Sequence, residues 1–429
     1  MIKKIIIVLA VILVSVVTSG VFAQAARVHK ITVTNTSGLI LTDKSIAIKR
    51  KEIPGISTRN FYPLLTGERG DTIPAQLDDL DGDKVWDELV FVRNIMPKSK
   101  EIITLKWIAD PIKFTKRTSV RFGVRQTKNS KIKPALSDTF YADQLPGVIG
   151  YQHYQTDGPT WENDKVAFRQ YLDGRNSIDV FGKTVNYMTP ENVGIGSDGV
   201  TENNYSVMKD WGTDILAVGN SVGIGGISFL IGDTLARLGV TEQDSLNNVD
   251  STIFKIIAEG PVRSTISTDY LHWKTLGRNY SAEAITSITP GNYAFKNAVR
   301  FNNLKGDETL VVGLVNSKTD QKLTEIVVND QWVVLLTHDK QTVNKEWWLG
   351  LALILPRKEY QGYMEAPKKG SVSTTYLGKL KIENNKPVNY YAVAGWELSD
   401  GKFSDAAQFK NYVVNLVQQL TAQVVVKVQ

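Results

Sequence analysis

Residues 165–181 read KVAFRQYLDGRNSIDVF, and the alternation within this stretch decides the fold prediction. In an extended chain, one side carries Val166, Phe168 and Leu172, and the other carries Lys165, Arg169, Tyr171 and Asp173. Asp173-Gly174 is a favourable hairpin turn, and residues 177–181 alternate again. The stretch therefore predicts a β-hairpin that packs an apolar face inward and presents cations, a phenol and carboxylates on its other face.

Short alternating runs of this kind recur along most of the chain, punctuated by Pro, Gly, Asn and Asp. They do not alternate with amphipathic helices, which argues against a parallel α/β fold. We predict an all-β, mainly antiparallel protein, with a small β-sandwich module at residues 26–137 and a large β-sandwich domain at residues 138–429. Residues 115–137 are less patterned and would act as a linker, and residues 215–218 would form a strand. A helix with Ser404 as N-cap closes the chain.

The first 25 residues have the features of an export signal. Lys3 and Lys4 precede an apolar run, and Ala23-Gln24-Ala25 is a small-x-small cleavage site. The alternative is an uncleaved membrane anchor, but the run at residues 5–17 is shorter than the ~20 residues that a spanning helix needs. We therefore predict a periplasmic or secreted protein whose mature chain, from residue 26, has no membrane segment.

The composition excludes several classes of site. The chain has no cysteine, which rules out lipid attachment through cysteine, disulfides and thiolate metal sites. Its net charge of +6 comes without a block of Lys or Arg, so nucleic-acid binding is not expected. None of the four histidines forms an HExxH motif, and no GxSxG elbow is present. The candidate groups that remain are carboxylates, tyrosines, Arg or Lys, and single histidines such as His153 and His272.

An acidic loop lies at residues 78–90, DDLDGDKVWDELV. The carboxylates that would hold an ion are Asp79, Asp81, Asp83, Asp87 and Glu88. Calcium prefers several carboxylate and carbonyl oxygens, so this spacing predicts a structural calcium site. The loop departs from an EF-hand at Lys84 and Val90, and the alternative is an acidic turn in which Asp side chains accept hydrogen bonds from backbone amides.

Aromatic and charged residues gather around the hairpin and in MKDWGTD, residues 208–214. The predicted substrate-binding residues are Trp161, Glu162, Asp164, Asp173, Arg175, Asp210 and Trp211. Rings beside Arg, Lys and carboxylates suit a sugar, especially one with a carboxylate that Arg can bind bidentately. The alternative interpretation is a solvated sheet face with cross-strand ion pairs.

Two reactions would use this set of residues. Elimination from a uronic acid needs a neutraliser, which would be Arg169 or Lys165, a base, which would be His153 or His272, and Tyr171 as the acid. Hydrolysis needs two carboxylates instead, for which Glu162, Asp164, Asp210 and Asp214 are available. An epimerase would use the same histidines and carboxylates and is the less favoured reaction.

Three stretches carry a resemblance to a known family: residues 153–183, residues 210–226 (DWGTDILAVGNSVGIGG) and residues 76–91 (QLDDLDGDKVWDELVF). Together they resemble domain-of-unknown-function family 4861, over most of the mature chain. The resemblance implies a large β-sandwich of the galactose-mutarotase type behind a smaller β-domain. It also implies exported proteins of bacteria that degrade polysaccharides, especially uronate-containing ones.

Two functions are compatible with these observations. The first is an exported carbohydrate-active enzyme, a polysaccharide lyase or glycoside hydrolase, that acts on an acidic oligosaccharide. The alternative is a non-catalytic glycan-binding or scaffold protein of a polysaccharide-degradation system, which would use the same aromatics and cations for contact only. Neither function requires a cofactor other than the structural calcium.

Overall fold

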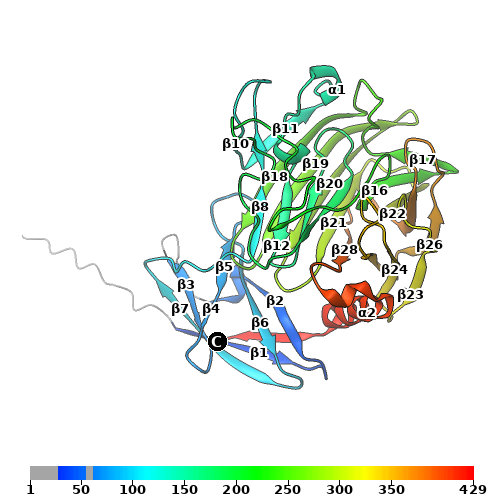
Figure 1. Cartoon of the computed structure of the whole chain (residues 1–429). Coiled ribbons are helices and arrows are strands. Elements are labelled where there is room, and N and C mark those ends of the chain that lie inside the picture. Colours follow the sequence, from blue (N-terminus) through cyan, green and yellow to red (C-terminus); the bar gives the residue numbers. More distant parts are fainter. Residues whose placement is uncertain (1–27, 55–60) are drawn as a thin grey trace, which may run out of the picture.

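The computed structural model describes residues 28–54 and 61–429, so the predicted signal peptide lies outside the described residues. All strand pairs of the described chain are antiparallel, with one isolated parallel bridge, and they form a small module beside a large sandwich (Figure 1). Within the same described ranges, no helix is both long and apolar enough to cross a membrane. The predicted all-β, mainly antiparallel fold class is confirmed.

The small module consists of two sheets around a core of its own. One sheet has the order β29 (Val424–Val428), β1 (His29–Asn35), β7 (Lys100–Ile108), β3 (Tyr62–Thr66) and β4 (Thr72–Ile73). The other has the order β2 (Leu41–Lys49), β6 (Glu88–Ile95) and β5 (Ala75–Asp78), with the 3₁₀ turn η1 (Arg50–Glu52) after β2. The first and last strands of the described residues, β1 and β29, pair with each other.

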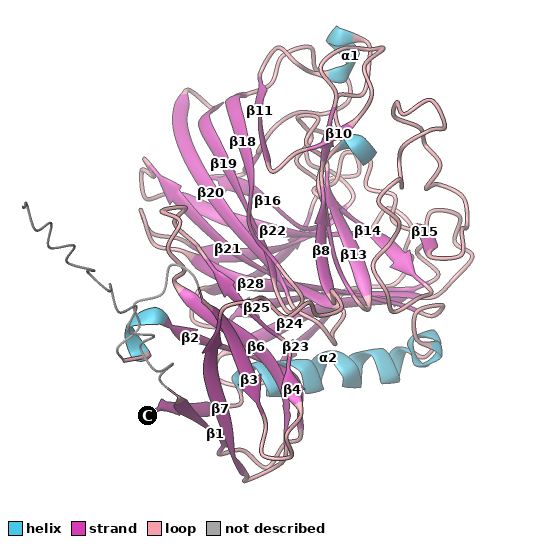
Figure 2. Ribbon diagram, turned by 90° about the vertical axis from the view of Figure 1, so that its left-hand side faces the viewer, coloured by secondary structure: helices cyan, strands magenta, loops and turns pink. Residues whose placement is uncertain are grey.

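The large domain places a nine-stranded sheet against a second layer of two five-stranded sheets (Figure 2). The nine strands, in order, are β11 (Ser137–Tyr141), β18 (Val249–Glu259), β19 (Ser264–Thr275), β20 (Arg278–Ile288), β21 (Ala294–Asn302), β28 (Val388–Trp396), β25 (Leu349–Pro356), β24 (Trp332–Asp339) and β23 (Thr324–Val327). Strand β20 shows the alternation behind this arrangement, because every second side chain from Tyr280 to Ile288 is buried in the core.

The two five-stranded sheets are joined by a bridge between Ile178 and Gly223. The first has the order β15 (Gly212–Asp214), β14 (Ile178–Lys183), β13 (Val166–Gln170), β12 (Thr160–Asn163) and β8 (Thr118–Arg121). The second has the order β17 (Thr234–Arg237), β16 (Ile224–Ile231), β22 (Glu308–Val315), β27 (Thr375–Lys381) and β26 (Tyr360–Glu365). Aromatic contacts such as Phe168 with Phe295, at 4.7 Å between ring centroids, join the two layers.

A few short elements and one long helix complete the fold. The short ones are β9 (Gly123–Val124), β10 (Lys133–Pro134), α1 (Pro146–Ile149), η2 (Gln155–Asp157) and η3 (Gly401–Ser404). Helix α2 (Ala406–Thr421) buries Phe409, Val413, Leu416 and Val417 against the large domain. Its N-cap is Asp405, whose carboxylate accepts a hydrogen bond from the Gln408 N–H at 2.8 Å, one residue after the predicted Ser404.

The structure differs from the sequence prediction at three places. The predicted linker contains β8, which pairs with β12 in the large domain, so the two domains divide before residue 137. Residues 215–218 are not a strand, because the pairing of β15 with β14 ends just after Asp214, where the Ile215 N–H donates to the Val180 carbonyl at 3.1 Å. The hairpin is present as β13 and β14, but residues 171–177 form a longer loop than a two-residue turn. Gly174 lies in this loop at φ +97°, where a Cβ would come within 2.4 Å of the Leu145 side chain.

Candidate functional site

The polar face of the hairpin surrounds a buried guanidinium. Arg169, on β13, is 1% exposed and lies opposite Asp179 of β14 in the sheet register. Its Nε donates to Asp179 Oδ1 at 3.1 Å, and its Nη2 donates to Asp214 Oδ2 at 2.8 Å and to Asp179 Oδ2. Asp157 Oδ2 lies 3.9 Å from Nη1. One cation is therefore shared by three carboxylates, two of which bind it directly.

Asp214 is the carboxyl group whose ionisation is most perturbed in this cluster. Burial raises its pKa to about 7, and the negative charge of Asp179 adds to the increase, while Arg169 opposes it. Burial also raises the pKa of Asp157. At neutral pH, Asp214 therefore exists in both protonation states, which is the property that a general acid or base requires.

Tyr171 lies between two guanidinium groups. Its ring centroid is 4.3 Å from Cζ of Arg169 and 3.9 Å from Cζ of Arg175, and the Arg169 Nη2 donates to its hydroxyl group. Burial raises the pKa of Tyr171, so the phenol keeps its proton. Arg175 is paired as well. Its Nε donates to Asp173 Oδ2 at 2.9 Å, and its Nη1 donates to Glu242 Oε1 at 2.8 Å.

Two hollows adjoin this cluster and share Arg175 in their walls. The larger, of about 510 Å³, is lined by Tyr171, Arg175, Asp214, Glu346 and Trp347, among others. The smaller, of about 250 Å³, is lined by Asp157, Asp173, Arg175, Glu242 and Asp244, among others. We call the larger hollow the Asp214 cleft. It is the place where a perturbed carboxyl group meets a space large enough for a ligand.

A long segment between β14 and β15 covers the rest of this polar sheet face. Thr189 of that segment donates from its N–H and hydroxyl group to Glu162, at 3.0 and 2.6 Å, and Lys183 donates to the same carboxylate at 2.6 Å. Tyr205 of the same segment packs on Phe181 and donates to Asp157 Oδ2 at 3.3 Å. The polar face is therefore interior and is not the solvated sheet face of the alternative interpretation.

The structure brings together five of the predicted site residues and leaves others apart. Those that meet at the cluster are Arg169, Tyr171, Asp173, Arg175 and Asp214. His153 lies outside the lining of both hollows and contacts Asp138 Oδ2 at 3.2 Å. His272 is exposed at a bulge of β19 and contacts Asn279. Lys165 is in the β12–β13 turn, at the opposite end of β13 from Tyr171. These three are not in place to act at Asp214.

The remaining predicted binding residues serve other contacts. Trp161 is 1% exposed and packs on Phe295 in the core, so it is not an open platform for a sugar. Glu162 is paired with Lys183, and Asp164 accepts from Arg117 at the domain interface. Asp210 and Trp211 line a different hollow. Sequence reasoning missed Asp157 and Asp179 as site residues, although Asp179 falls on the polar face of the predicted return strand.

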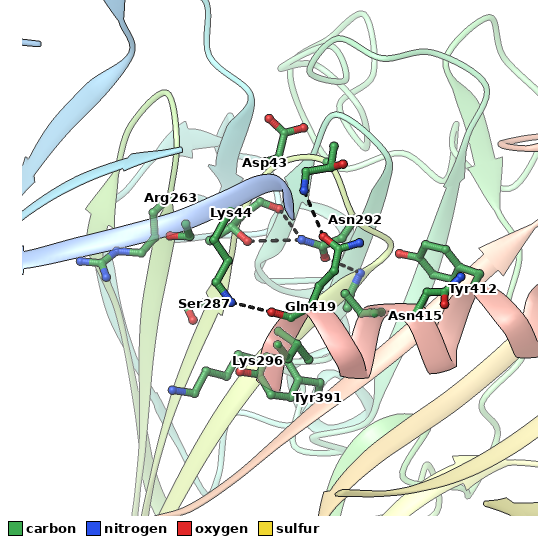
Figure 3. Close-up of a pocket in the computed structure, with 17 residues that line it drawn as sticks. Asp43, Lys44, Arg263, Ser287, Asn292, Lys296, Tyr391, Tyr412, Asn415 and Gln419 are labelled. Carbon is green, nitrogen blue, oxygen red and sulfur yellow. Dashed lines mark hydrogen bonds between the residues drawn. The ribbon is translucent and has the colours of Figure 1, made fainter. Parts of the chain in front are cut away.

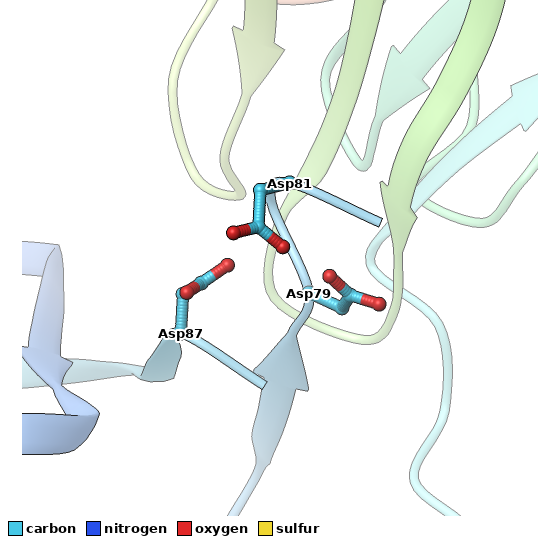
Figure 4. A group of neighbouring side chains, drawn as sticks. All are labelled: Asp79, Asp81 and Asp87. Carbon is cyan, nitrogen blue, oxygen red and sulfur yellow. The ribbon is translucent and has the colours of Figure 1, made fainter. Parts of the chain in front are cut away.

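Three of the five predicted calcium ligands converge in the acidic loop (Figure 4). Asp79, Asp81 and Asp87 each offer an oxygen within 4.8 Å of the others. Glu88 instead pairs with Arg263 at 2.9 Å, and Asp83 accepts from the Val85 N–H at 2.7 Å. Asp79, Asp81 and Asp87 also accept hydrogen bonds from backbone N–H groups. For example, the Leu80 N–H donates to Asp87 Oδ2 at 2.7 Å. They fit a calcium site only if carbonyl and water oxygens complete it.

Calcium binding in this loop stays a prediction with a direct measurement. If the ion binds, millimolar CaCl₂ should raise the Tm of the protein and EDTA should lower it, because a ligand that binds only the folded state stabilises it. Replacing Asp81 by Asn should remove the difference, whereas Asp83→Asn should keep it. An identical Tm in calcium and EDTA would leave the acidic turn as the interpretation of the loop.

Comparisons with known proteins place the chain in a family. Residues 33–426 match the family described as Domain of unknown function (DUF4861). The chain belongs to this family. A curated relative, "Uncharacterized protein P7" of Formosa agariphila, is 28% identical over 295 residues, which cover 64% of this chain and 68% of that protein. The family resemblance expected from residues 153–183, 210–226 and 76–91 is thus confirmed.

Two solved structures align with most of this member of the family. One is titled as an α-mannosidase from Enterococcus faecalis V583 and is 10% identical, with a TM-score of 0.47; the match covers 93% of this chain and 46% of that one. The other is titled as a protein in the glycosyl hydrolase family 38 from Enterococcus faecalis and is 9% identical, with a TM-score of 0.47; the match covers 93% and 47%. The chain thus spans about half the length of the solved structures that it matches.

Proposed function

We propose that this protein is a carbohydrate-active enzyme that hydrolyses a glycosidic bond in the Asp214 cleft. The observation that carries the proposal is a carboxyl group with a pKa of about 7 in the wall of a hollow of about 510 Å³. Such a group is protonated in part of the molecules at neutral pH, and in its protonated form it can deliver the proton to a leaving oxygen. Trp347 and the ring of Tyr171, in the same wall, offer apolar surface to a sugar.

Hydrolysis fits the charges of this site better than elimination does. A lyase needs a free cation to neutralise the uronate carboxylate, but both arginines of the site are already paired. Arg169 binds Asp179 and Asp214, and Arg175 binds Asp173 and Glu242. The excess of carboxylates around the cleft would repel an acidic sugar unit. The unit cleaved there would therefore be a neutral one, within a substrate that carries its acidic groups elsewhere.

The proton movements can be assigned to two carboxyl groups. Protonated Asp214 gives its proton to the glycosidic oxygen as the bond from that oxygen to the anomeric carbon breaks. A water molecule attacks the anomeric carbon and passes its proton to a carboxylate, for which Glu346 is available in the same hollow. The products are two saccharides, one of which has a new reducing end, and the exchange of protons with water restores the enzyme.

The substrate that we propose is an oligosaccharide from a uronate-containing polysaccharide, met outside the cytoplasm. The support for this is the signal-like sequence at residues 1–25 and the polysaccharide context that the family resemblance implies. Purified protein should be incubated with neutral, pectic and algal oligosaccharides. New reducing ends without absorbance from unsaturated uronates would support hydrolysis. Unsaturated products would show that the reaction is elimination and not hydrolysis. Binding without products would favour the glycan-binding alternative.

A further inference from the structure

A second pocket, of about 500 Å³, lies where the small module, the nine-stranded sheet and helix α2 meet (Figure 3). The module contributes residues 42–45 of β2, and the helix contributes Tyr412, Asn415 and Gln419. The floor is the outer face of the sheet, where Ser287, Lys296 and Tyr391 lie side by side in register on β20, β21 and β28. None of these residues lines the Asp214 cleft.

The walls of the pocket are held in place by charged contacts between the domains. Arg117 donates to both carboxylate oxygens of Asp43, at 2.7 and 2.9 Å, and also to Asp164 in the large domain. Asp43 lies within a register shift of β2, between Leu41 and Lys44, and its carboxylate would lie only 2.3 Å from a Cβ at Gly291. Two domains that approach this closely form a pre-organised pocket rather than an open groove.

Two cations in the pocket have no carboxylate partner. Lys44 donates to the backbone carbonyl of Gln419 at 2.6 Å, and neither Lys44 nor Lys296 takes part in an ion pair within residues 28–54 and 61–429. Burial lowers the pKa of both lysines, which means that each charge lacks part of its hydration. The acidic groups nearby are already used, because Asp43 binds Arg117 and Glu88 binds Arg263.

We propose that this pocket binds an oxyanion carried by a saccharide, a carboxylate or a sulfate ester, between Lys44 and Lys296. Both lysines are partly buried, and a partly buried cation without a counter-charge is costly; an anionic ligand supplies that charge. The rest of the lining suits the sugar itself. Ser45, Ser287, Asn292, Asn415 and Gln419 offer amide and hydroxyl groups, and Tyr391 offers a ring. The pocket would hold an acidic unit of the substrate without cleaving it.

The test is a binding titration with defined probes at low ionic strength. Glucuronate, a sulfated monosaccharide, glucose and inorganic sulfate are titrated into purified protein by calorimetry. The two acidic sugars should bind more tightly than both glucose and inorganic sulfate, and added salt should lower the affinity of the acidic sugars. Lys296→Gln and Lys44→Gln should each reduce their affinity by about tenfold or more, since a hydrogen bond to a charged group is lost. Lys255→Gln is the matched control, because Lys255 is exposed on β18 outside the pocket.

Each outcome separates the alternatives. Equal affinity for glucose and glucuronate, or unchanged binding in both pocket variants with normal melting, would overturn the proposal. Inorganic sulfate that binds as tightly as the sulfated sugar would show a site for small anions and would also overturn it. Binding at this pocket does not require turnover at Asp214. An Asp214→Asn variant should bind glucuronate as the wild type does, so the two proposals fail independently.

Discussion

Replacing Asp214 by Asn is expected to lower kcat/KM on the saccharide substrate by about 10²- to 10⁴-fold, the usual contribution of a general acid. The amide has nearly the same shape and can still accept a hydrogen bond from Arg169, but it has no acidic proton to donate. The loss should fall mainly on kcat, because the proton is delivered in the transition state. Initial rates from reducing-end release would measure it.

The activity and the stability of the protein should both depend on pH through the protonation of Asp214. Asp214 acts in its protonated form, so wild-type activity should fall as the pH rises through about 7, and Asp214→Asn should lose this limb of the profile. Stability should move in the same direction. The folded state binds the proton more tightly than the unfolded chain, so the free energy of unfolding falls as the pH rises from the ordinary aspartate pKa of 3.8 toward 7. The Asn variant should show a weaker fall.

Asp210→Asn is the matched control for this prediction. Asp210 lies four residues earlier, is exposed, and lines a hollow other than the Asp214 cleft, so its variant should keep full activity. Equal rates for wild type and Asp214→Asn would remove Asp214 from the mechanism. Activity lost equally in both variants would point to a general effect on folding of this region, which a melting curve would reveal.

The hairpin was predictable because its alternation is local. Val166 and Phe168 pack inward, and Arg169 and Tyr171 share the opposite face, as the period of two requires. What could not be predicted is that the second face is also buried. The segment between β14 and β15 covers it through Thr189 and other residues, and sequence alternation carries no information on such a cover.

Contacts between residues far apart in the sequence were the hardest feature to predict. Asp214 meets Arg169 only because β15 pairs with β14 in one particular register, and Trp161 enters the core for a similar reason. One of the two partners of β1, strand β29, comes from the other end of the chain, so the small module could not be recognised as discontinuous by composition. The sequence offers His272 as a catalytic base, yet it is an exposed residue at a strand bulge.

Replacing Arg169 by Met is expected to be strongly destabilising, by about 3–5 kcal/mol, because it removes one partner of a buried ion cluster. Asp179 is 0% exposed and would lose its cation, and Asp214 would lose the group that favours its charged form. The ring contacts of the guanidinium with Tyr171, Phe181 and Tyr205 would be replaced only in part by the thioether.

The mechanism of that loss can be separated from a general packing defect by a double-mutant cycle in urea. If uncompensated charge is the cause, adding Asp179→Asn to Arg169→Met should recover part of the free energy of unfolding, although Asp179→Asn alone destabilises the wild type. The defect of Arg169→Met should also shrink as the pH falls toward 5, where protonation neutralises the orphaned carboxylates.

Arg175→Met serves as the comparison for Arg169→Met. Arg175 is partly exposed and pairs with Glu242 at the surface, so its loss should lower the free energy of unfolding by less. An Arg169→Met protein that unfolds at the wild-type urea concentration would mean that the cluster contributes nothing to the hairpin. A defect that is independent of pH and additive with Asp179→Asn would assign it to packing instead of charge.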